Sequence, residues 1–106
     1  MAVRFEWDKN KNRSNLAKHG IEFDAAVGVF ADPNSVMRFD REIGDERRWQ
    51  TIGRIPGGPL VVLVVHTLAD LEPVSALTDD IEIRIISARK ATPRERRLYE
   101  EGDWND

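Results

Sequence analysis

The chain has 106 residues, no cysteine and a formal net charge of −3 at pH 7. This length suits one domain with a single hydrophobic core, and the absence of cysteine from the sequence excludes disulfides and thiolate metal sites. Residues 60–65 form the longest aliphatic run and are too few to span a bilayer, and the first residues lack the apolar segment of a signal peptide, so we expect a cytoplasmic protein.

The N-terminal part of the sequence predicts a strand followed by two helices. Residues 3–7 alternate apolar and polar side chains, which is typical of a short strand. Asp8 then precedes a polar segment that ends at Gly20, so we predict a helix with an aspartate N-cap and a left-handed glycine at its end. Apolar side chains recur at helical spacing between residues 23 and 30, and this second helix stops before Pro33.

The central part of the sequence predicts three strands and one loop. Residues 35–40 and 47–55 have strand character, and the turn sequence PGGP joins the second of these to residues 60–68. Residues 60–68 are apolar on both faces and therefore belong in the middle of a covered sheet. Residues 69–80 have no clear period and predict a loop, which precedes the last strand at residues 81–89.

The C-terminal part of the sequence predicts one more helix. Thr92 and Glu95 have the spacing of a capping box, with Pro93 at the first helical position, and the helix ends near Gly102. We therefore predict one domain over residues 1–102 and an acidic tail over residues 103–106. The order β-α-α-β-β-β-α predicts an α+β fold around a mostly antiparallel sheet.

Basic and acidic residues are segregated along the chain. Residues 84–97 contain six bases and one acid, whereas residues 69–82 and the end of the chain from Leu98 contain acids and no base. The local field near a patch steers an anionic ligand, so a net charge of −3 does not exclude one.

A strict two-residue period in the strands places several polar residues at the ends of apolar faces. Arg89 shares a face with Ile83 and Ile85, and His66 shares a face with Val62 and Val64. We predict that these polar ends converge on one sheet surface, beside the bases of the last helix.

Several of these charged residues also have an ordinary structural explanation. On the last helix, Arg96 and Arg97 are each followed four residues later by a glutamate, as in ion pairs on a solvated helix. Arg84 can pair on the surface with nearby Glu82.

The histidines and aromatic residues have structural explanations too. His19 can cap the first helix next to Gly20, and His66 can be a half-buried histidine with one hydrogen bond. Trp104 in the tail is not readily explained by core packing. The other aromatic side chains considered for base stacking are expected in the core: Trp7, Phe39 and Trp49.

Four blocks of sequence are distinctive in this order: FEWDKNKNRSNLAKHGIEFDAAVGVFADP, ERRWQTIGR, LVVLVVHT and IRIISARKATPRERRLYEE. Together they resemble the BrnT family of toxins from type II toxin–antitoxin modules, over about residues 5–101. The departure lies in residues 69–80, which are longer than the turn that the family leads us to expect.

The resemblance implies a RelE-like ribonuclease fold and a bacterial or archaeal toxin that arrests growth by cutting RNA. It also implies a BrnA-type antitoxin with a ribbon-helix-helix domain, and operator DNA would be contacted only through the toxin–antitoxin complex. Metal-independent ribonucleases use the 2′-hydroxyl of the RNA as nucleophile and leave a cyclic phosphate. We expect neither a metal nor a cofactor, since the two histidines are too far apart in sequence for a zinc motif.

Such a reaction needs cations against the phosphate and a group that transfers protons. We rank Arg89 first as the phosphate clamp because guanidinium binds phosphate with two parallel hydrogen bonds, followed by Lys18 and Arg96. His66 and Tyr99 are the candidates for proton transfer, and Glu95 can be explained by capping alone. Five further bases are expected to bind RNA: Lys11, Arg54, Arg84, Lys90 and Arg94.

Two alternatives remain open. An inactive relative would be a non-enzymatic module that docks an acidic protein partner through the same basic surface. Direct DNA binding is less favoured, because the sequence has no helix-turn-helix pattern and its bases are divided between the two ends. An active toxin should be difficult to express without the product of the adjacent gene, whereas a binding module should express freely.

Overall fold

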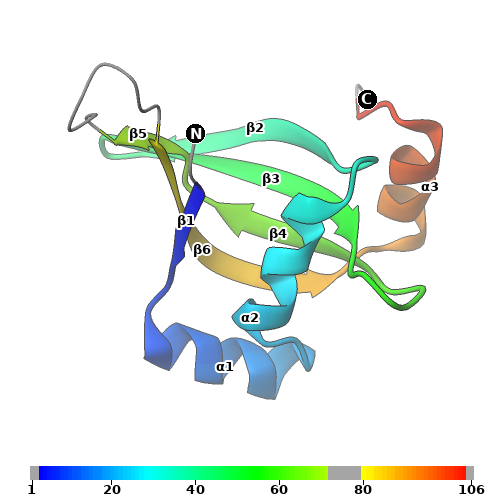
Figure 1. The fold of residues 1–106 in the computed structure, drawn as a ribbon, viewed down its shortest axis with the longest axis horizontal. Coiled ribbons are helices and arrows are strands. Elements are labelled where there is room, and N and C mark those ends of the chain that lie inside the picture. Colours follow the sequence, from blue (N-terminus) through cyan, green and yellow to red (C-terminus); the bar gives the residue numbers. More distant parts are fainter. Residues whose placement is uncertain (1–2, 72–79, 105–106) are drawn as a thin grey trace.

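A six-stranded sheet forms the frame of the computed structural model, which describes residues 3–71 and 80–104 (Figure 1). The spatial order of the strands is β1-β6-β4-β3-β2, and β5 pairs with the start of β6 beside β4. β1 runs parallel to β6, and the other pairs are antiparallel, which confirms the predicted α+β, mostly antiparallel architecture. The strands are β1 (Val3–Glu6), β2 (Val36–Ile43), β3 (Glu46–Arg54), β4 (Val61–His66), β5 (Ala69–Leu71) and β6 (Asp80–Lys90).

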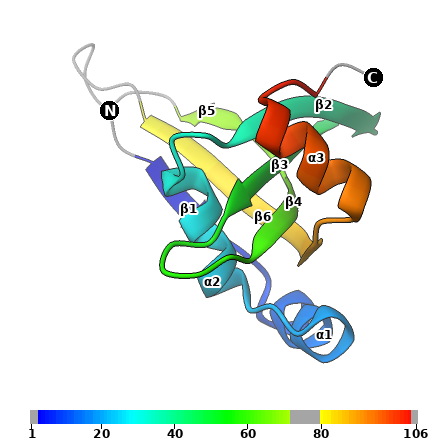
Figure 2. The same ribbon diagram turned by 90° about the vertical axis from the view of Figure 1, so that its right-hand side faces the viewer.

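Helices lie on both faces of this sheet. In Figure 2, α2 and α3 are seen on opposite sides of the central strands. The helical elements are α1 (Lys9–His19), α2 (Phe23–Ala26), the 3-10 helix η1 (Val27–Ala31) and α3 (Pro93–Glu101). None of the helices in the described part of the chain has the length and apolar character needed to cross a bilayer.

Each face of the sheet carries its own cluster of buried apolar side chains. β4 contributes to both, because its side chains alternate: Val62 and Val64 pack in the first core with α2 and η1. Val61 and Leu63 pack in the second core with α3. The predicted position of this strand in the middle of a covered sheet is therefore confirmed.

The helix ends follow local sequence signals. The carboxylate of Asp8 accepts the N–H groups of Asn10 and Lys11, and the backbone of Gly20 is left-handed at φ 72°. At α3, the side chain of Thr92 accepts the N–H of Glu95 while the Glu95 carboxylate accepts the N–H of Thr92. The predicted N-cap and capping box are both confirmed.

The predicted order places three strands after the helices, whereas the structure has five within the residues that it describes. Residues 69–71 form β5 instead of the start of a loop, and the observed order is β-α-α-β-β-β-β-β-α. The first part of β6 extends past β4, so its backbone groups on that side are left for another segment to pair with. Backbone pairing does not require alternating side chains, so residues 69–71 can form a strand without a periodic pattern. The rest of the predicted loop, residues 72–79, lies outside the described residues.

A bulge in β6 overturns the predicted convergence of Arg89 with His66. His66 pairs with Ile85, but its neighbour Val65 pairs with Ser87, so β6 has one extra residue at this point. The extra residue reverses the alternation of side chains beyond it. Arg89 therefore lies on the opposite face from His66, and the assignment of both to one surface was wrong.

Core placement was predicted correctly for Trp7 and wrongly for Phe39, and Trp49 belongs to neither core cluster. Trp7 packs edge-on against Phe23 of the first core, and Trp49 is half-buried. Phe39 contacts Trp49 edge-on but is 48% exposed, because it lies on β2 at the edge of the sheet.

Trp104 lies in the second core, although the sequence offers no periodic pattern that would place it there. Its side chain is 8% exposed and packs with Tyr99 and Leu63. The guanidinium of Arg38, on β2, lies 4.4 Å from the centre of the Trp104 ring system. The segment after α3 therefore folds back against the sheet.

Candidate functional site

Basic side chains gather at the end of the sheet where α3 lies, around two adjoining pockets. The first has a volume of about 460 Å³, and the second, of about 400 Å³, shares Glu100 with it. We call their combined lining the α3 site. Its residues come from the loop after η1, from the ends of β3 and β6, and from α3 with the residue that precedes its cap (Figure 2). They are Asp32, Asn34, Arg54, Lys90, Ala91, Pro93, Arg96, Arg97, Tyr99 and Glu100.

Arg89, ranked first as the phosphate clamp, is bound by a carboxylate next to this site. Its two terminal nitrogens donate to the two oxygens of Glu95 at 2.7 and 2.9 Å. These hydrogen bonds raise the pKa of Arg89 and lower the pKa of Glu95. Because the same carboxylate accepts the N–H of Thr92, the pair ties the end of β6 to the start of α3.

The exposed bases of the α3 site are positioned by the end of β6 and by α3. Lys90 is exposed at the end of β6, and Arg96 and Arg97 are exposed on α3. A terminal nitrogen of Arg96 donates to the carbonyl oxygen of Pro59 at 3.2 Å, although an ion pair with Glu100 was one explanation that the sequence offered for this residue. Arg94 is also exposed, in the first turn of α3.

Tyr99 and Asp32 form the most buried polar contact of the site. The Tyr99 hydroxyl donates to Oδ2 of Asp32 at 2.6 Å, and the tyrosine is 7% exposed. The same oxygen accepts the backbone N–H of Arg54 at 2.8 Å, and Oδ1 accepts that of Asn34 at 2.9 Å. Sequence reasoning missed Asp32, since an aspartate before a proline at the end of a helix is common in turns.

The Tyr99–Asp32 contact sets the protonation of both groups. Burial alone would raise the pKa of Asp32, but the hydrogen bonds from Tyr99 and from the N–H groups of Arg54 and Asn34 outweigh it and lower that pKa. Burial and the hydrogen bond to the Asp32 carboxylate raise the pKa of Tyr99, and they outweigh the charge and the hydrogen bond of Arg54, which lower it. At neutral pH, Asp32 is therefore ionised and Tyr99 carries its proton.

His66 lies away from the α3 site and is fully buried in the first core. Nδ1 donates to the carbonyl oxygen of Thr67 at 2.8 Å, so Nε2 is free of hydrogen and accepts the hydroxyl of Thr51 at 2.7 Å. The ring also meets Phe30 edge-on, and burial lowers its pKa. The sequence predicted a half-buried histidine with one hydrogen bond, whereas its exposure is 0% and both nitrogens are bonded.

Two lysines of α1 line a separate pocket of about 270 Å³ against β6. Lys11 and Lys18 share this pocket because residues seven apart lie on the same face of a helix. Between them, the buried side chain of Asn15 donates to the carbonyl oxygens of Ile21 and Ala88, and its own oxygen accepts the N–H of Ala88. This amide fixes α1 to β6 and thereby fixes the position of the two lysines.

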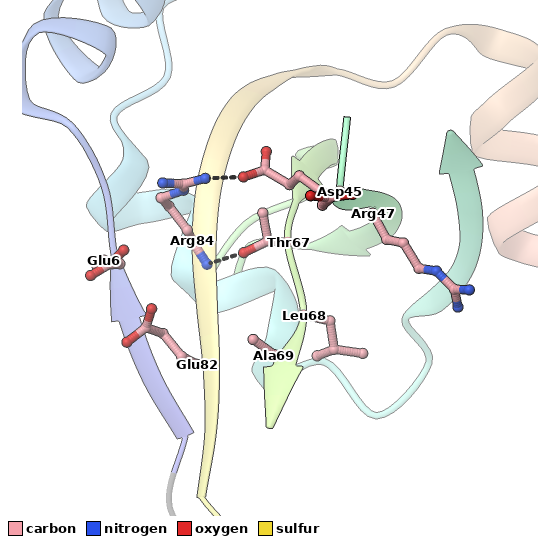
Figure 3. Close-up of a pocket in the computed structure, with 9 residues that line it drawn as sticks. Glu6, Asp45, Arg47, Thr67, Leu68, Ala69, Glu82 and Arg84 are labelled. Atoms are coloured by element: carbon pink, nitrogen blue, oxygen red, sulfur yellow. Dashed lines mark hydrogen bonds and ion pairs between the residues drawn. The ribbon is translucent and has the colours of Figure 1, made fainter. Parts of the chain in front are cut away.

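Arg84 lies at the other end of the sheet, in a pocket of about 470 Å³ (Figure 3). Its guanidinium is bound by Glu46 instead of the predicted Glu82. The backbone N–H of Arg84 donates to Thr67 Oγ1 at 3.1 Å. Carboxylates outnumber guanidiniums in this lining, so its charge disfavours phosphate. The charged lining residues are Glu6, Asp45, Glu46, Arg47, Glu82 and Arg84.

The structure thus brings together five of the ten residues proposed from the sequence and keeps the others apart. Arg54, Lys90, Arg96 and Tyr99 line the α3 site, and Arg89 adjoins it through Glu95. Those that lie elsewhere or were not found in its lining are His66, Lys11, Lys18, Arg84 and Arg94.

Comparison with known proteins identifies a family for this chain. Residues 7–95 fit the model of a protein family described as ribonuclease toxin, BrnT, of type II toxin–antitoxin systems. A search of curated proteins finds no match. Because the family model covers most of the sequence, the chain belongs to the BrnT family of ribonuclease toxins, as its sequence blocks indicated.

Proposed function

We propose that this BrnT-family toxin cleaves RNA at the α3 site, by metal-independent attack of the 2′-hydroxyl on the adjacent phosphate. The observation that carries the proposal is the adjacency of two pockets that share Glu100: one is lined by Tyr99 and Arg54, and the other by exposed bases of β6 and α3. A ribonuclease of this kind needs both features, because charge develops on the phosphate oxygens while protons move between oxygen atoms.

Arg54, Lys90 and Arg96 are the groups that we assign to the scissile phosphate. All three are exposed and line the site, so their cationic heads can reach an RNA strand. Guanidinium offers two parallel hydrogen bonds to phosphate oxygens. Arg89 was ranked above them from the sequence, but its guanidinium is already bound by both oxygens of Glu95, and we assign it to holding α3 in place.

Tyr99 is our candidate for proton transfer. His66, the other candidate from the sequence, is fully buried and uses both ring nitrogens inside the protein. Lys11 and Lys18 lie in the pocket on α1, where we propose that they bind phosphates flanking the cleavage position, and Arg94 would do the same on α3. Arg84 is left out of this set because it is bound by Glu46.

The antiparallel strands with a C-terminal helix on one face fit the RelE-like fold that the family resemblance implies. We propose that a BrnA-type ribbon-helix-helix antitoxin neutralises the toxin in the cytoplasm, and that operator DNA is contacted through their complex.

The purified protein, incubated with single-stranded RNA in excess EDTA, tests the proposal. We expect cleavage that leaves 2′,3′-cyclic phosphate ends, with a substrate lacking the 2′-hydroxyl left intact. Arg96→Ala should lower the rate by about 10²–10³, as for removal of one positioned donor to the transition state. Arg41→Ala is the matched control, since this arginine is 68% exposed and lies on β2.

Two results would contradict the proposed function. Activity that disappears with the chelator and returns with a divalent ion would exclude the metal-independent mechanism. A protein that expresses freely without its antitoxin and cuts no RNA would favour the non-enzymatic binding module.

A further inference from the structure

The hydroxyl of Tyr99 faces the pocket as a hydrogen-bond acceptor. A phenol has one proton, and an ionised carboxylate can only accept. In the 2.6 Å contact with Asp32, the proton must therefore lie between Tyr99 and the carboxylate. The side chain of Arg54, in the same pocket, also donates a hydrogen bond to the tyrosine oxygen. The second lone pair of that oxygen is then available to accept a hydrogen bond from a ligand in the pocket.

We propose that Asp32 is the final acceptor of the proton that the RNA 2′-hydroxyl loses, and that this proton reaches it through the hydroxyl of Tyr99. The inference rests on the proposed ribonuclease function and assigns a role to a residue that the proposed function leaves unassigned. A direct acceptor role for Tyr99 alone would require a phenolate, whereas the relay keeps the tyrosine neutral before and after the step.

The relay balances in atoms and charge. The 2′-hydroxyl gives its proton to the Tyr99 oxygen while Tyr99 gives its own proton to Oδ2 of Asp32. The 2′-oxygen forms a bond to phosphorus, and the bond from phosphorus to the 5′-oxygen of the next nucleotide breaks. That 5′-oxygen takes a proton from solvent water, and the hydroxide formed is neutralised by the proton that Asp32 then releases.

The surroundings of Asp32 suit a fixed acceptor. Its carboxylate is held by main-chain N–H groups of two elements, so its orientation does not depend on the substrate. The charged groups that face the Tyr99 hydroxyl within this pocket are Asp32 from the end of η1, Arg54 from β3 and Glu100 from α3. Of the two acids, Asp32 is the one in hydrogen-bond contact with the hydroxyl.

The pH dependence of single-turnover cleavage distinguishes the relay from a structural role of Asp32. With Asp32 as acceptor, the rate should be flat between about pH 6 and pH 9, since the carboxylate is ionised throughout and Tyr99 keeps its proton. Asp32→Asn removes the acceptor, so Tyr99 must ionise first. Its rate at pH 7 should be lower by about 10²–10³ and should rise about tenfold per pH unit, as the phenolate fraction does.

Two further variants complete the experiment. Asp24→Asn, an exposed aspartate in the first turn of α2, is the matched control and should keep the flat profile. Tyr99→Phe leaves the main-chain bonds of Asp32 in place and should be slow at every pH, with no rise. Thermal melting of each variant shows whether it is folded at the assay temperature.

Each outcome decides the inference. A wild-type rate that itself rises tenfold per pH unit, or a folded Asp32→Asn protein with the wild-type rate and a flat profile, overturns the relay while the ribonuclease function stands. If Asp32→Asn does not fold, Tyr99→Phe decides, because wild-type activity in that variant also overturns the relay. A wild-type protein that cuts no RNA under any condition overturns the proposed function itself.

Discussion

The ion pair between Arg89 and Glu95 illustrates how a base near a candidate site can serve the fold. The partners lie six residues apart, one at the end of β6 and the other in the first turn of α3. Glu95 also closes the capping box, so its carboxylate accepts hydrogen bonds both from Arg89 and from the backbone N–H of Thr92. The capping role was predictable because its partner is three residues away, whereas the pairing with Arg89 depends on how the strand enters the helix.

Replacement of Arg89 by alanine should therefore destabilise the protein more than it impairs cleavage. We expect a loss of about 1–2 kcal/mol in the free energy of unfolding, at the low end for a charge-assisted hydrogen bond because the arginine side chain is partly exposed. Urea unfolding measures the loss, with Arg41→Ala as control. A fully stable Arg89→Ala protein that no longer cleaves RNA would instead restore Arg89 as the phosphate clamp.

Asp32 marks the limit of residue-level prediction for the site. Its hydrogen-bond partners on β3 and α3 are 22 and 67 residues away in sequence. Tyr99, by contrast, was a candidate because its residue type alone fits proton transfer. The chemistry of a residue can therefore be predicted from the sequence. The hydrogen bond that orients the Tyr99 hydroxyl toward Asp32 depends on the tertiary structure.

The strands and helices were predictable wherever a local signal fixes them. Caps, glycine stops and the apolar run of β4 depend on near neighbours in sequence, and they were predicted correctly. β5 and the β6 bulge depend on which backbone groups a neighbouring strand leaves open, and neither was predicted. The bulge matters for function because it decides which face carries Arg89.

At the same scale, the segment after α3 is expected to hold that helix against the sheet. Trp104→Ala removes a side chain that is 8% exposed and packs with Tyr99 and Leu98. We expect a loss of about 3 kcal/mol in stability, the usual cost of truncating a buried tryptophan. Thermal melting measures it, and Trp49→Ala, at a half-buried tryptophan on β3, should cost less. Equal losses would argue against this docking.

The pockets at the two ends of the sheet carry opposite net charge. The α3 site lies at one end of the sheet, and the carboxylate-rich pocket with Arg84 lies at the other (Figure 1). A net charge of −3 therefore conceals a basic end and an acidic end. Such a distribution turns an approaching polyanion toward α3, because the field of a charged patch acts over about a Debye length.

Binding of RNA should weaken steeply as salt is added. If Arg54, Lys90, Arg96 and Arg97 each neutralise one phosphate, log K should fall with log salt at a slope of about −0.7 per contact, or about fifty-fold between 50 and 200 mM. An oligonucleotide without the reactive 2′-hydroxyl allows titration without cleavage. Arg97→Ala should reduce the slope by about 0.7, and a flat response in the wild type would point to a protein as the ligand.

The bulge in β6 also gives this strand a tolerance in length. If Ile86 were deleted, His66 would still pair with Ile85 and Val65 with Ser87. All the remaining side chains of β6 would then stay on the face of the sheet that they now occupy. β4 has no such reserve: deletion of Val64 would turn the residues on one side of the gap to the opposite face. Circular dichroism of the two deletion variants should show a folded protein in the first case and an unfolded one in the second. The chain can therefore lose one residue at the bulge beside α1 while β4, the strand between the two cores, stays unchanged.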